Sequence, residues 1–465
     1  MTFTSMDTRP DTELSDAVAM GLRENVAGAV MLPWDPGYDE ARTIWNGMID
    51  KRPALIIQCA GVADVIQAIR FAGEQMLPVS IKAGGHNVAG HAVSEGGLMI
   101  DLSQMRAVHV DPKRRTARVE GGATWRNLDR ETSVFGLATT GGVISSTGVA
   151  GLTLGGGIGW LVGKYGLAID NLISVDLVTA GGDFLTASDD EHNDLFWALR
   201  GGGGNFGVVT SFEFRLHPVD QVLAGMLVWP IDQLRGLMEH YREFTRDNPE
   251  EMTFYLETGS DHESGTRIAA VGGVYPGEIA KGERLVDGLR AFSPPIADMI
   301  EPMPYRNFQM AFDEEFPHGR RYYWKGLLLR EIHDAVIDAV AEAESAVPLP
   351  GCIIAIEHYR GAMNRVPVGA TAFAHRNAQY QLVIIGGCDD PGDDERVKEW
   401  VRGLYTAAQP YGLNAPFLNF NSVEPTEQLS AVRTSFGPNY NRLARIKRQY
   451  DPGNLFHGNN NIPPE

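Results

Sequence analysis

Hydrophobic and polar positions in the first part of the chain follow the periods of both helix and strand. The apolar run Pro53–Ala60 predicts a short buried strand, and Val62–Gln75 repeats its apolar residues at the helical period. Pro78–Lys82 predicts a second strand, and a strand–helix–strand unit normally forms a parallel pair. Short strands follow over 98–102, 108–110, 116–120, 172–179, 183–187 and 207–216. This pattern predicts an α+β fold rather than the regular alternation of a doubly wound sheet.

From about residue 220 the helices become longer and glycine becomes rarer. Amphipathic patterns predict helices over 231–245, 278–292, 332–346 and 393–408, with strands between them over 252–257, 267–275, 322–329, 352–359 and 378–385. Strands that alternate with helices in this way predict an open sheet with helices on one face, whose other face is free to cover a ligand. The last 45 residues return to the glycine- and asparagine-bearing style of the first part, so we expect them to fold back onto it.

Charge and cysteine content exclude several classes of protein. The net charge is −19, so we expect no binding to nucleic acid or to an anionic membrane surface. No apolar run is long enough for a transmembrane helix, and the charged segment Met1–Leu14 does not resemble a signal peptide. The three cysteines, Cys59, Cys352 and Cys388, are too widely spaced for a disulfide framework or a CxxC metal site. We expect a cytoplasmic protein, and its oligomeric state stays open.

Glycine is concentrated in one part of the chain, where 25 of the 53 glycines lie between Gly84 and Gly207. Ala83–Asn87 directly follows a predicted strand, and its successive N–H groups are able to surround a phosphate. Residues 140–159 carry no charge and no regular period, so their backbone groups need partners, which a large, flat polar ligand would supply. The segment 202–207 matches GxGxxG, but a helix precedes it and a strand follows it, the reverse of a dinucleotide fingerprint.

His86 has three interpretations from its position alone. It is a surface-loop histidine, a metal ligand together with His91, or a reactive imidazole beside an anion site. The metal site is disfavoured because no third ligand has a motif-like spacing nearby, and we expect no metal.

In combination, several motifs resemble those of the berberine-bridge-enzyme-like FAD-linked oxidases, within the p-cresol-methylhydroxylase-type (PCMH-type) flavin-binding superfamily. The resemblance spans nearly the whole chain, from Tyr38–Arg42 to 462–464. The motifs are Gly84–Gly90 (GGHNVAG), Ile100–Ser103 (IDLS), Gly155–Leu161 (GGGIGWL), Lys164–Leu167 (KYGL), Asp170–Leu172 (DNL), Asp194–Val209 (DLFWALRGGGGNFGVV) and Tyr450–Phe456 (YDPGNLF).

The resemblance implies both the fold and the cofactor. Members bind FAD in extended form between two subdomains, and a separate substrate domain lies over the flavin ring. We therefore expect an FAD-binding domain over 1–218, with its PCMH-type core at about 49–218. A substrate domain over 219–412 is expected to carry an antiparallel sheet covered by helices on one face, and 413–465 to return to the FAD domain. The FAD-binding residues implied by the motifs are Lys82, Ala83, Gly84, Gly85, His86, Asn87, Thr147, Gly148, Val149, Gly151, Thr153, Gly156, Gly157, Ile169, Asn171, Gly207, Val208, Val209, Asn459 and Asn461.

The resemblance also implies a covalent bond from His86 to the flavin 8α-methyl group, and three positions depart from the family pattern. Ile169 stands where many members carry a cysteine that forms a second flavin bond, so we expect attachment through His86 only. Phe417 and Phe420 occupy the tyrosine positions of a Tyr-x-Asn-Tyr motif, so the usual general base is absent or has moved. Residues 456–462 (FHGNNNI) lack the arginine that usually follows the phenylalanine.

The implied activity is that of an FAD-dependent oxidase. It takes hydride from a small organic metabolite, aromatic, polyketide- or alkaloid-like, and passes the electrons to O2 to give H2O2. Val149 aligns with the family's oxygen-gating position. Candidate bases on predicted strands include Tyr323, Glu357 and His375. We favour Tyr323 and His375, and His375 is the best single candidate because its imidazole titrates near neutral pH. Three alternatives stay open: a carbohydrate oxidase, a flavin dehydrogenase with another acceptor, and a non-catalytic flavin-binding protein.

Overall fold

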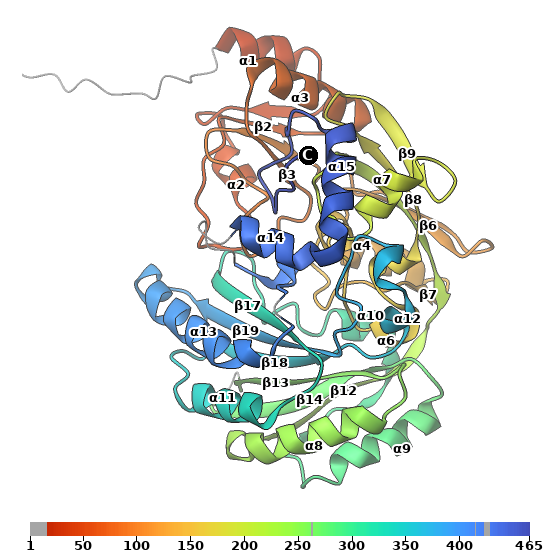
Figure 1. Ribbon diagram of the computed structural model, residues 1–465, viewed down its shortest axis with the longest axis vertical. Helices are drawn as coiled ribbons and strands as arrows, with labels where there is room; N and C mark the ends of the chain where they lie inside the picture. Colours follow the sequence, from red (N-terminus) through yellow and green to blue (C-terminus); the bar gives the residue numbers. More distant parts are fainter. Residues whose placement is uncertain (1–15, 262–263, 414, 423–427) are drawn as a thin grey trace, which may run out of the picture.

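The computed structural model of the protein describes residues 16–261, 264–413, 415–422 and 428–465. Figure 1 shows two parts stacked along the long axis: the N-terminal residues and the last helices lie above, and the segment from about 220 to 410 lies below. The described chain begins with α1 (Asp16–Arg23), β1 (Ala29–Met31) and α2 (Tyr38–Arg42) at the upper end. No helix within the described residues is both long and apolar enough to cross a membrane.

A four-stranded sheet in the order β1-β2-β4-β3 forms the upper end of the molecule. The strands β2 (Leu55–Gln58) and β3 (Val79–Lys82) both run parallel to β4 (Leu98–Asp101). The predicted pair is therefore parallel, but its members are not neighbours, because the fully buried β4 lies between them. The helix α3 (Val62–Gln75) has the bounds that its apolar period predicts, and it buries that stripe against the sheet.

The second sheet is antiparallel and has the order β5-β6-β10-β8-β9. Each strand lies within one residue of its predicted ends: β5 (Val108–Asp111), β6 (Thr116–Glu120), β8 (Leu172–Val178), β9 (Phe184–Ser188) and β10 (Val208–Arg215). A short pair, β7 (Leu137–Ala138) and β11 (His217–Pro218), lies beside it, and α7 (Asn193–Leu199) precedes the glycine loop before β10.

Four of the α-helices between β1 and β8 were not predicted, α2 among them. The helix α4 (Trp125–Ser133) begins with a capping-box pair, Thr124 and Asn127, in which Asn127 Oδ1 accepts from both the backbone N–H and the hydroxyl group of Thr124 at 3.0 Å. The helix α5 (Val149–Leu154) lies inside the uncharged segment for which the sequence showed no period. It is only six residues long, which is too short for a periodic apolar stripe to be visible, and α6 (Val162–Tyr165) follows it.

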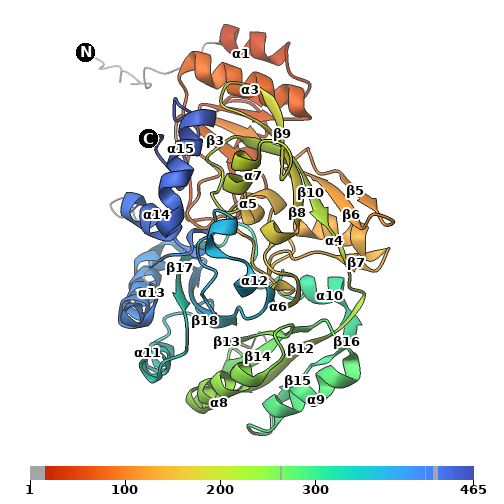
Figure 2. The ribbon, with the colours of Figure 1, turned by 45° about the vertical axis from the view of Figure 1, so that its right-hand side comes forward.

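The lower part is one large antiparallel sheet in the order β15-β12-β14-β13-β18-β19-β17. Its strands are β12 (Gln221–Pro230), β13 (Thr253–Ser260), β14 (Arg267–Tyr275), β15 (Ala297–Asp298), β16 (Glu301–Pro304, paired with β12), β17 (Arg321–Leu329), β18 (Ile353–His358) and β19 (Tyr380–Cys388). The helices α8 (Leu234–Asp247), α9 (Ile279–Arg290), α11 (Asp334–Ser345) and α13 (Asp394–Ala408) cover the face that points away from the upper part in both ribbon views (Figures 1 and 2). The α+β class and the helices on one face are as predicted, whereas β12, β15 and β16 were not predicted.

The C-terminal residues of the chain contact the upper part again. The helices α14 (Gln428–Phe436) and α15 (Tyr440–Tyr450) lie beside it, and α15 packs against α7. The ammonium group of Lys447 on α15 is fully buried and donates to Asn205 O at 2.8 Å, Phe456 O at 3.0 Å and Asp451 Oδ2 at 2.6 Å. All three of its hydrogens are thus used, and they join the C-terminal segment to the glycine loop before β10.

Candidate functional site

A cavity of about 330 Å³ lies where the glycine loops of the upper part face the uncovered side of the large sheet. Of the residues that the sequence assigns to the cofactor, those that line it are Ala83, Gly84, Gly85, His86, Asn87, Thr147, Gly148, Gly151, Gly207, Val208, Val209 and Asn459. The C-terminal segment contributes Phe417–Phe420 and 458–460, and the large sheet contributes side chains from β13, β17, β18 and β19. Segments far apart in the sequence therefore meet around one cavity.

The loop after β3 presents a row of free backbone donors to this cavity. Among the described residues, the backbone N–H groups of residues 84–88 donate to no acceptor. Five successive donors beside a cavity form the kind of nest that binds an anion. Gly85 and Val88 are buried, and a buried backbone N–H without a partner is costly, so this row of donors indicates a ligand with several acceptor oxygens.

The two glycines at the centre of this loop region are required by backbone packing. A Cβ added to Gly84 would lie 2.5 Å from Gly148 N, and one added to Gly148 would lie 2.6 Å from Gly84 N. The loop after β3 and the N-terminal end of α5 thus touch backbone to backbone. At Gly84 the room left by the missing side chain is filled by Gly148 and not by a ligand. Gly151 is different, because a Cβ there would have no atom within 4 Å.

His86 is half-buried, and its imidazole lies at the end of a stack of aromatic rings. Trp45 stacks on it with ring centroids 4.3 Å apart, and Tyr322 stacks on the other side of Trp45 at 4.1 Å. Burial lowers the pKa of His86 to about 4, so the ring is neutral at physiological pH. Its Nε2 atom is buried and has no hydrogen-bond partner among the described residues. A neutral, oriented imidazole with an unused ring nitrogen fits covalent attachment to a ligand in the cavity.

The other predicted cofactor residues lie behind the cavity wall. Lys82 donates from Nζ to Ala41 O at 2.7 Å, and the Asn171 amide donates to the carbonyl oxygens of Tyr165 and Leu167. Val149 and Thr153 on α5 are fully buried. These residues, together with Gly156, Gly157, Ile169 and Asn461, do not line the cavity in this structure. Their contacts stabilise the loops that do line the cavity.

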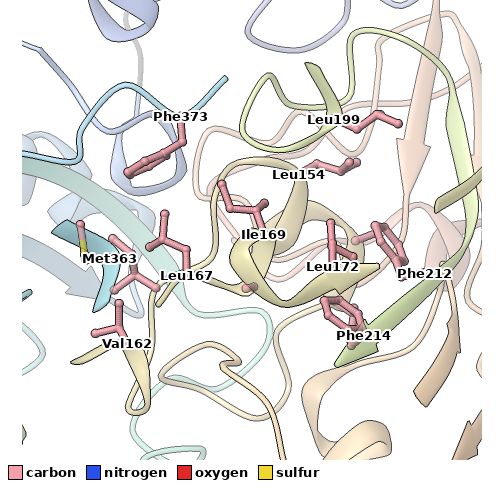
Figure 3. Packing of buried hydrophobic residues seen from close by; sticks show 14 of the residues in the cluster. Leu154, Val162, Leu167, Ile169, Leu172, Leu199, Phe212, Phe214, Met363 and Phe373 are labelled. Atoms are coloured by element: carbon pink, nitrogen blue, oxygen red, sulfur yellow. The ribbon is translucent and has the colours of Figure 1, made fainter. Parts of the chain in front are cut away.

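Ile169 packs as an ordinary core residue. Figure 3 shows its side chain between Phe373 and Leu167 on one side and Leu154 and Leu172 on the other. The side chain has no exposed surface and belongs to the largest hydrophobic cluster. An isoleucine has no group that forms a thioether, and here the space is filled by hydrocarbon contacts.

Glu357 on β18 faces the cavity and is hydrogen-bonded to Tyr359. The Tyr359 hydroxyl also lies 2.8 Å from Gln381 Oε1. A hydroxyl has one hydrogen, so both contacts are satisfied when a protonated Glu357 donates to Tyr359 and Tyr359 donates to Gln381. Burial raises the pKa of Glu357 to about 7, which agrees with this arrangement. The carboxyl group is poised to exchange a proton near neutral pH.

Glu257 on β13 is a second carboxyl group in the cavity, and the sequence analysis did not single it out. It pairs across the strands with Ala355, two residues before Glu357 on the same face of β18. Burial and the neighbouring carboxylates of Glu315 and Glu357 raise the pKa of Glu257 to about 8. The only sequence signal was its position at the end of a predicted strand, because its neighbours depend on a register that the sequence does not show.

The other two candidate bases occupy different surroundings. His375 lines the cavity but lies in the loop before β19, not on a strand as predicted. Its Nε2 lies 3.2 Å from Ser435 Oγ, and burial lowers its pKa to about 4 rather than leaving it near neutral. Tyr323 does not line the cavity. It packs in the core under the helices, where Arg402 donates to its hydroxyl group at 3.3 Å.

The segment in place of the Tyr-x-Asn-Tyr motif closes one side of the cavity. Phe417 and Phe420 both line it, with ring centroids 5.4 Å apart, so the motif's positions face the site although neither side chain ionises. The Asn419 amide donates to Leu152 O at 3.3 Å and occupies the space beside Gly155, where a Cβ would lie 2.1 Å from its Oδ1 atom.

No group of three or more His, Cys, Asp or Glu side chains in the described ranges is arranged to hold a metal ion. His91 lines the cavity near His86, and its Nε2 is also buried without a partner among these residues. Burial lowers the pKa of His91 to about 4.

Comparison with known proteins adds an independent line of evidence. The family model described as an FAD binding domain matches residues 53–188, and the one described as berberine and berberine like matches 416–463. An FAD-linked oxidoreductase from Dictyostelium discoideum is 32% identical over 447 residues, which cover 95% of this chain and 96% of the relative. (R)-6-hydroxynicotine oxidase from Paenarthrobacter nicotinovorans is 32% identical over 457 residues, which cover 95% of this chain and 98% of that enzyme.

Solved structures share the architecture. The crystal structure of 6-hydroxy-D-nicotine oxidase from Arthrobacter nicotinovorans has a TM-score of 0.85 at 32% identity and covers 95% of this chain and 98% of its own. Berberine bridge enzyme from Eschscholzia californica has a TM-score of 0.82 at 22% identity, with 96% and 98% covered, so that likeness concerns the fold. The expected PCMH-type fold is confirmed.

Proposed function

Because this chain belongs to the berberine-bridge-enzyme-like family of FAD-linked oxidoreductases, we propose that it is an oxidase of small organic metabolites. It removes hydride from the substrate and passes the electrons to O2, giving H2O2. One observation carries the proposal: a single cavity is lined both by a nest of backbone donors with a neutral His86 and by the carboxyl groups of Glu257 and Glu357. The first set, which we call the cofactor end, suits a phosphate-bearing cofactor. The second set, which we call the substrate end, suits proton transfer to or from a substrate.

The residues present fit FAD. The N–H groups of residues 84–88 would hold the pyrophosphate, and His86 Nε2 or its other ring nitrogen would carry the covalent bond to the flavin. When bound, the flavin supplies a two-electron acceptor for hydride. Attachment is single, because Ile169 forms no thioether and all three cysteines are buried elsewhere. A peptide map that finds flavin on Cys59, Cys352 or Cys388 would contradict this part of the proposal.

Glu357 is the best-placed general base of the three candidates. It faces the cavity, its pKa is raised to about 7, and Tyr359 and Gln381 provide a path that stabilises either protonation state. His375 faces the same cavity but is neutral and hard to protonate, with a pKa lowered to about 4. Tyr323 is on the opposite side of the sheet.

The substrate end of the cavity favours a metabolite with an apolar body. Its walls are formed largely by aromatic and aliphatic side chains, among them Trp160, Phe312, Phe316 and Trp324. This lining supports an aromatic or alkaloid-like compound, in line with the name of the nicotine-oxidising relative. The three free, buried cysteines support the further proposal of a cytoplasmic protein.

The test is anaerobic reduction of the holoprotein by a panel of metabolites, followed by loss of the flavin absorbance near ~450 nm. Admission of air should restore the colour and yield one H2O2 per flavin. Reoxidation only by an added quinone would identify a dehydrogenase, and a flavin that no member of a broad panel bleaches would count against catalysis.

The pH dependence of flavin reduction separates the two cavity bases. A carboxyl group accepts a proton only when ionised, so with Glu357 as base the rate rises with pH through about 7. With His375 as base the rise would come near pH 4. We expect Glu357→Gln to lower the rate by about 10²–10⁴-fold and to remove the step near 7. The matched control is Glu342→Gln, an exposed residue on α11, which should change neither. An unchanged profile in Glu357→Gln would refute the assignment.

A further inference from the structure

Among the lysine, arginine, aspartate and glutamate side chains of the described residues, only acidic ones line the cavity. Glu257 and Glu357 line it, whereas no lysine or arginine does among the described residues. Glu257 makes no hydrogen bond or ion pair within the described part of the chain, and the neighbours that influence it electrostatically, Glu315 and Glu357, carry the same charge. A carboxyl group in such a place lacks the counter-ion that a buried charge requires, so it ionises readily only when a cation lies beside it.

We propose, on the basis of the oxidase function above, that the substrate is a cationic amine with an apolar body and that Glu257 binds its ammonium group. Three features of the site carry the proposal: the missing counter-ion, the space beside Glu257, and the aromatic walls.

The strand register provides the space. Glu257 lies opposite Ala355, whose side chain is a single methyl group, so the sheet surface is low at this point. Glu357 is the next residue along β18 that points to the same side. An ammonium group placed over Ala355 would lie between the two carboxyl groups, with Glu257 as its binding partner and Glu357 within reach of its proton.

Aromatic rings line the cavity around this position. Trp160 stacks on Tyr255 with ring centroids 4.7 Å apart and on Phe312 at 5.7 Å, and all three rings line the cavity. Tyr255 is on β13, two residues before Glu257 and on the same face. The faces of such rings attract cations, most strongly where water is excluded. The combination of carboxylate and aromatic rings favours a cationic amine over a sugar or a carboxylic acid.

The chemistry of an amine substrate balances with these residues. The ammonium form gives its extra proton to the ionised Glu357. The C–H bond next to nitrogen then breaks, its electron pair leaves with the hydrogen to the flavin, and the substrate becomes an iminium ion. The two electrons and that hydrogen, with one more proton, convert O2 to H2O2. In this scheme Glu257 binds the ammonium form before the proton transfer and the iminium ion after the hydride transfer, and the amine between these two steps is neutral. A cation beside Glu257 lowers its pKa and so favours its charged form.

Calorimetric titration of the flavin-loaded holoprotein tests recognition without turnover. Three probes share a benzyl group and differ in charge: benzyltrimethylammonium, benzyl alcohol and phenylacetate. We expect the cation to bind at least about tenfold more tightly than the other two, from its attraction to the carboxylate and the rings. Glu257→Gln should remove most of that preference, Glu257→Asp should retain part of it, and the surface variant Glu342→Gln should keep it all.

Equal affinity for the cation and the alcohol in the wild type would overturn the proposal, and so would an unchanged cation preference in Glu257→Gln. If that variant does not fold, the comparison of the three probes on the wild type still decides. Benzyltrimethylammonium has no lone pair on nitrogen and is not oxidised, so its binding does not depend on catalysis. If the protein binds the cation selectively but no metabolite reduces its flavin, the oxidase proposal is contradicted. The cation-binding site at Glu257 would still be supported.

Discussion

A buried ion pair between Arg376 and Asp170 joins the two parts of the protein next to the site. The guanidinium group donates to both oxygens of Asp170 at 2.7 Å, and it also donates to Thr371 Oγ1 and Met363 O. The arginine side chain is 1% exposed and the aspartate side chain 11%. Phe373 lies against the guanidinium at 5.4 Å, so the pair fixes the loop that carries three of the cavity-lining residues, 373–375.

We expect Arg376→Met to lower the free energy of unfolding by about 3–5 kcal/mol, because it leaves the carboxylate of Asp170 buried without its partner. Arg376→Lys keeps the charge but cannot form both bonds of the fork, so it should cost about 1–3 kcal/mol. The control is Arg235→Met, which removes an ion pair with Asp338 whose side chains are 54% and 59% exposed. It should cost at most ~1 kcal/mol.

Urea unfolding followed by tryptophan fluorescence measures these differences, and absorbance at equal protein concentration measures the flavin content. If the free energy of unfolding of Arg376→Met lies within ~1 kcal/mol of the wild-type value, as expected for the surface control, the ion pair stabilises the fold less than its burial implies. If it is destabilised but keeps full flavin content and the same rate of flavin reduction, the pair stabilises the fold without organising the cavity.

Two further predictions concern the cofactor end of the cavity. Acid-precipitated wild type should stay yellow and His86→Ala should release its flavin, while Trp45→Ala, which removes the stacked ring, should lower the covalent fraction without abolishing it; colour lost from the wild-type precipitate would contradict covalent attachment. Gly148→Ala should destabilise the protein by about 1–3 kcal/mol and reduce its flavin content, because the new Cβ would press on Gly84. Gly403→Ala, in α13 with no atom near the new methyl group, is the matched control and should not destabilise the fold.

The local pattern and composition of the sequence were sufficient to predict most of the helices and strands. The helix α3 and the strands β6 and β14 have the bounds that their apolar periods predict. The helix α4 was not predicted because it has few apolar residues. Its first turn is instead stabilised by the capping-box pair Thr124 and Asn127. The run over β12 is almost continuously apolar, which a period does not identify as strand or helix.

The site was predictable only where a motif marks it. The glycine loop with His86 is a contiguous signal, and the structure places it in the cavity. Glu257 became visible only when the register of β13 with β18 placed it beside Ala355. The loop of His375 is held by Arg376 and Asp170, 206 positions apart in the chain, a contact that no local pattern shows. The lowered pKa of His375 follows from burial, which is likewise a property of the assembled fold.

The two ends of the cavity depend on each other through charge. In the proposed holoenzyme the negative pyrophosphate is held by neutral backbone N–H groups of residues 84–88, and no lysine or arginine among the described residues lines the cavity. A cationic side chain there would stabilise the ionised forms of Glu257 and Glu357 and so lower the pKa of both carboxyl groups. Binding the phosphate with backbone instead leaves their pKa values raised, to about 8 and about 7. The glycine-rich loops therefore do more than fit the cofactor: they keep the carboxyl groups of the opposite wall able to exchange protons near neutral pH.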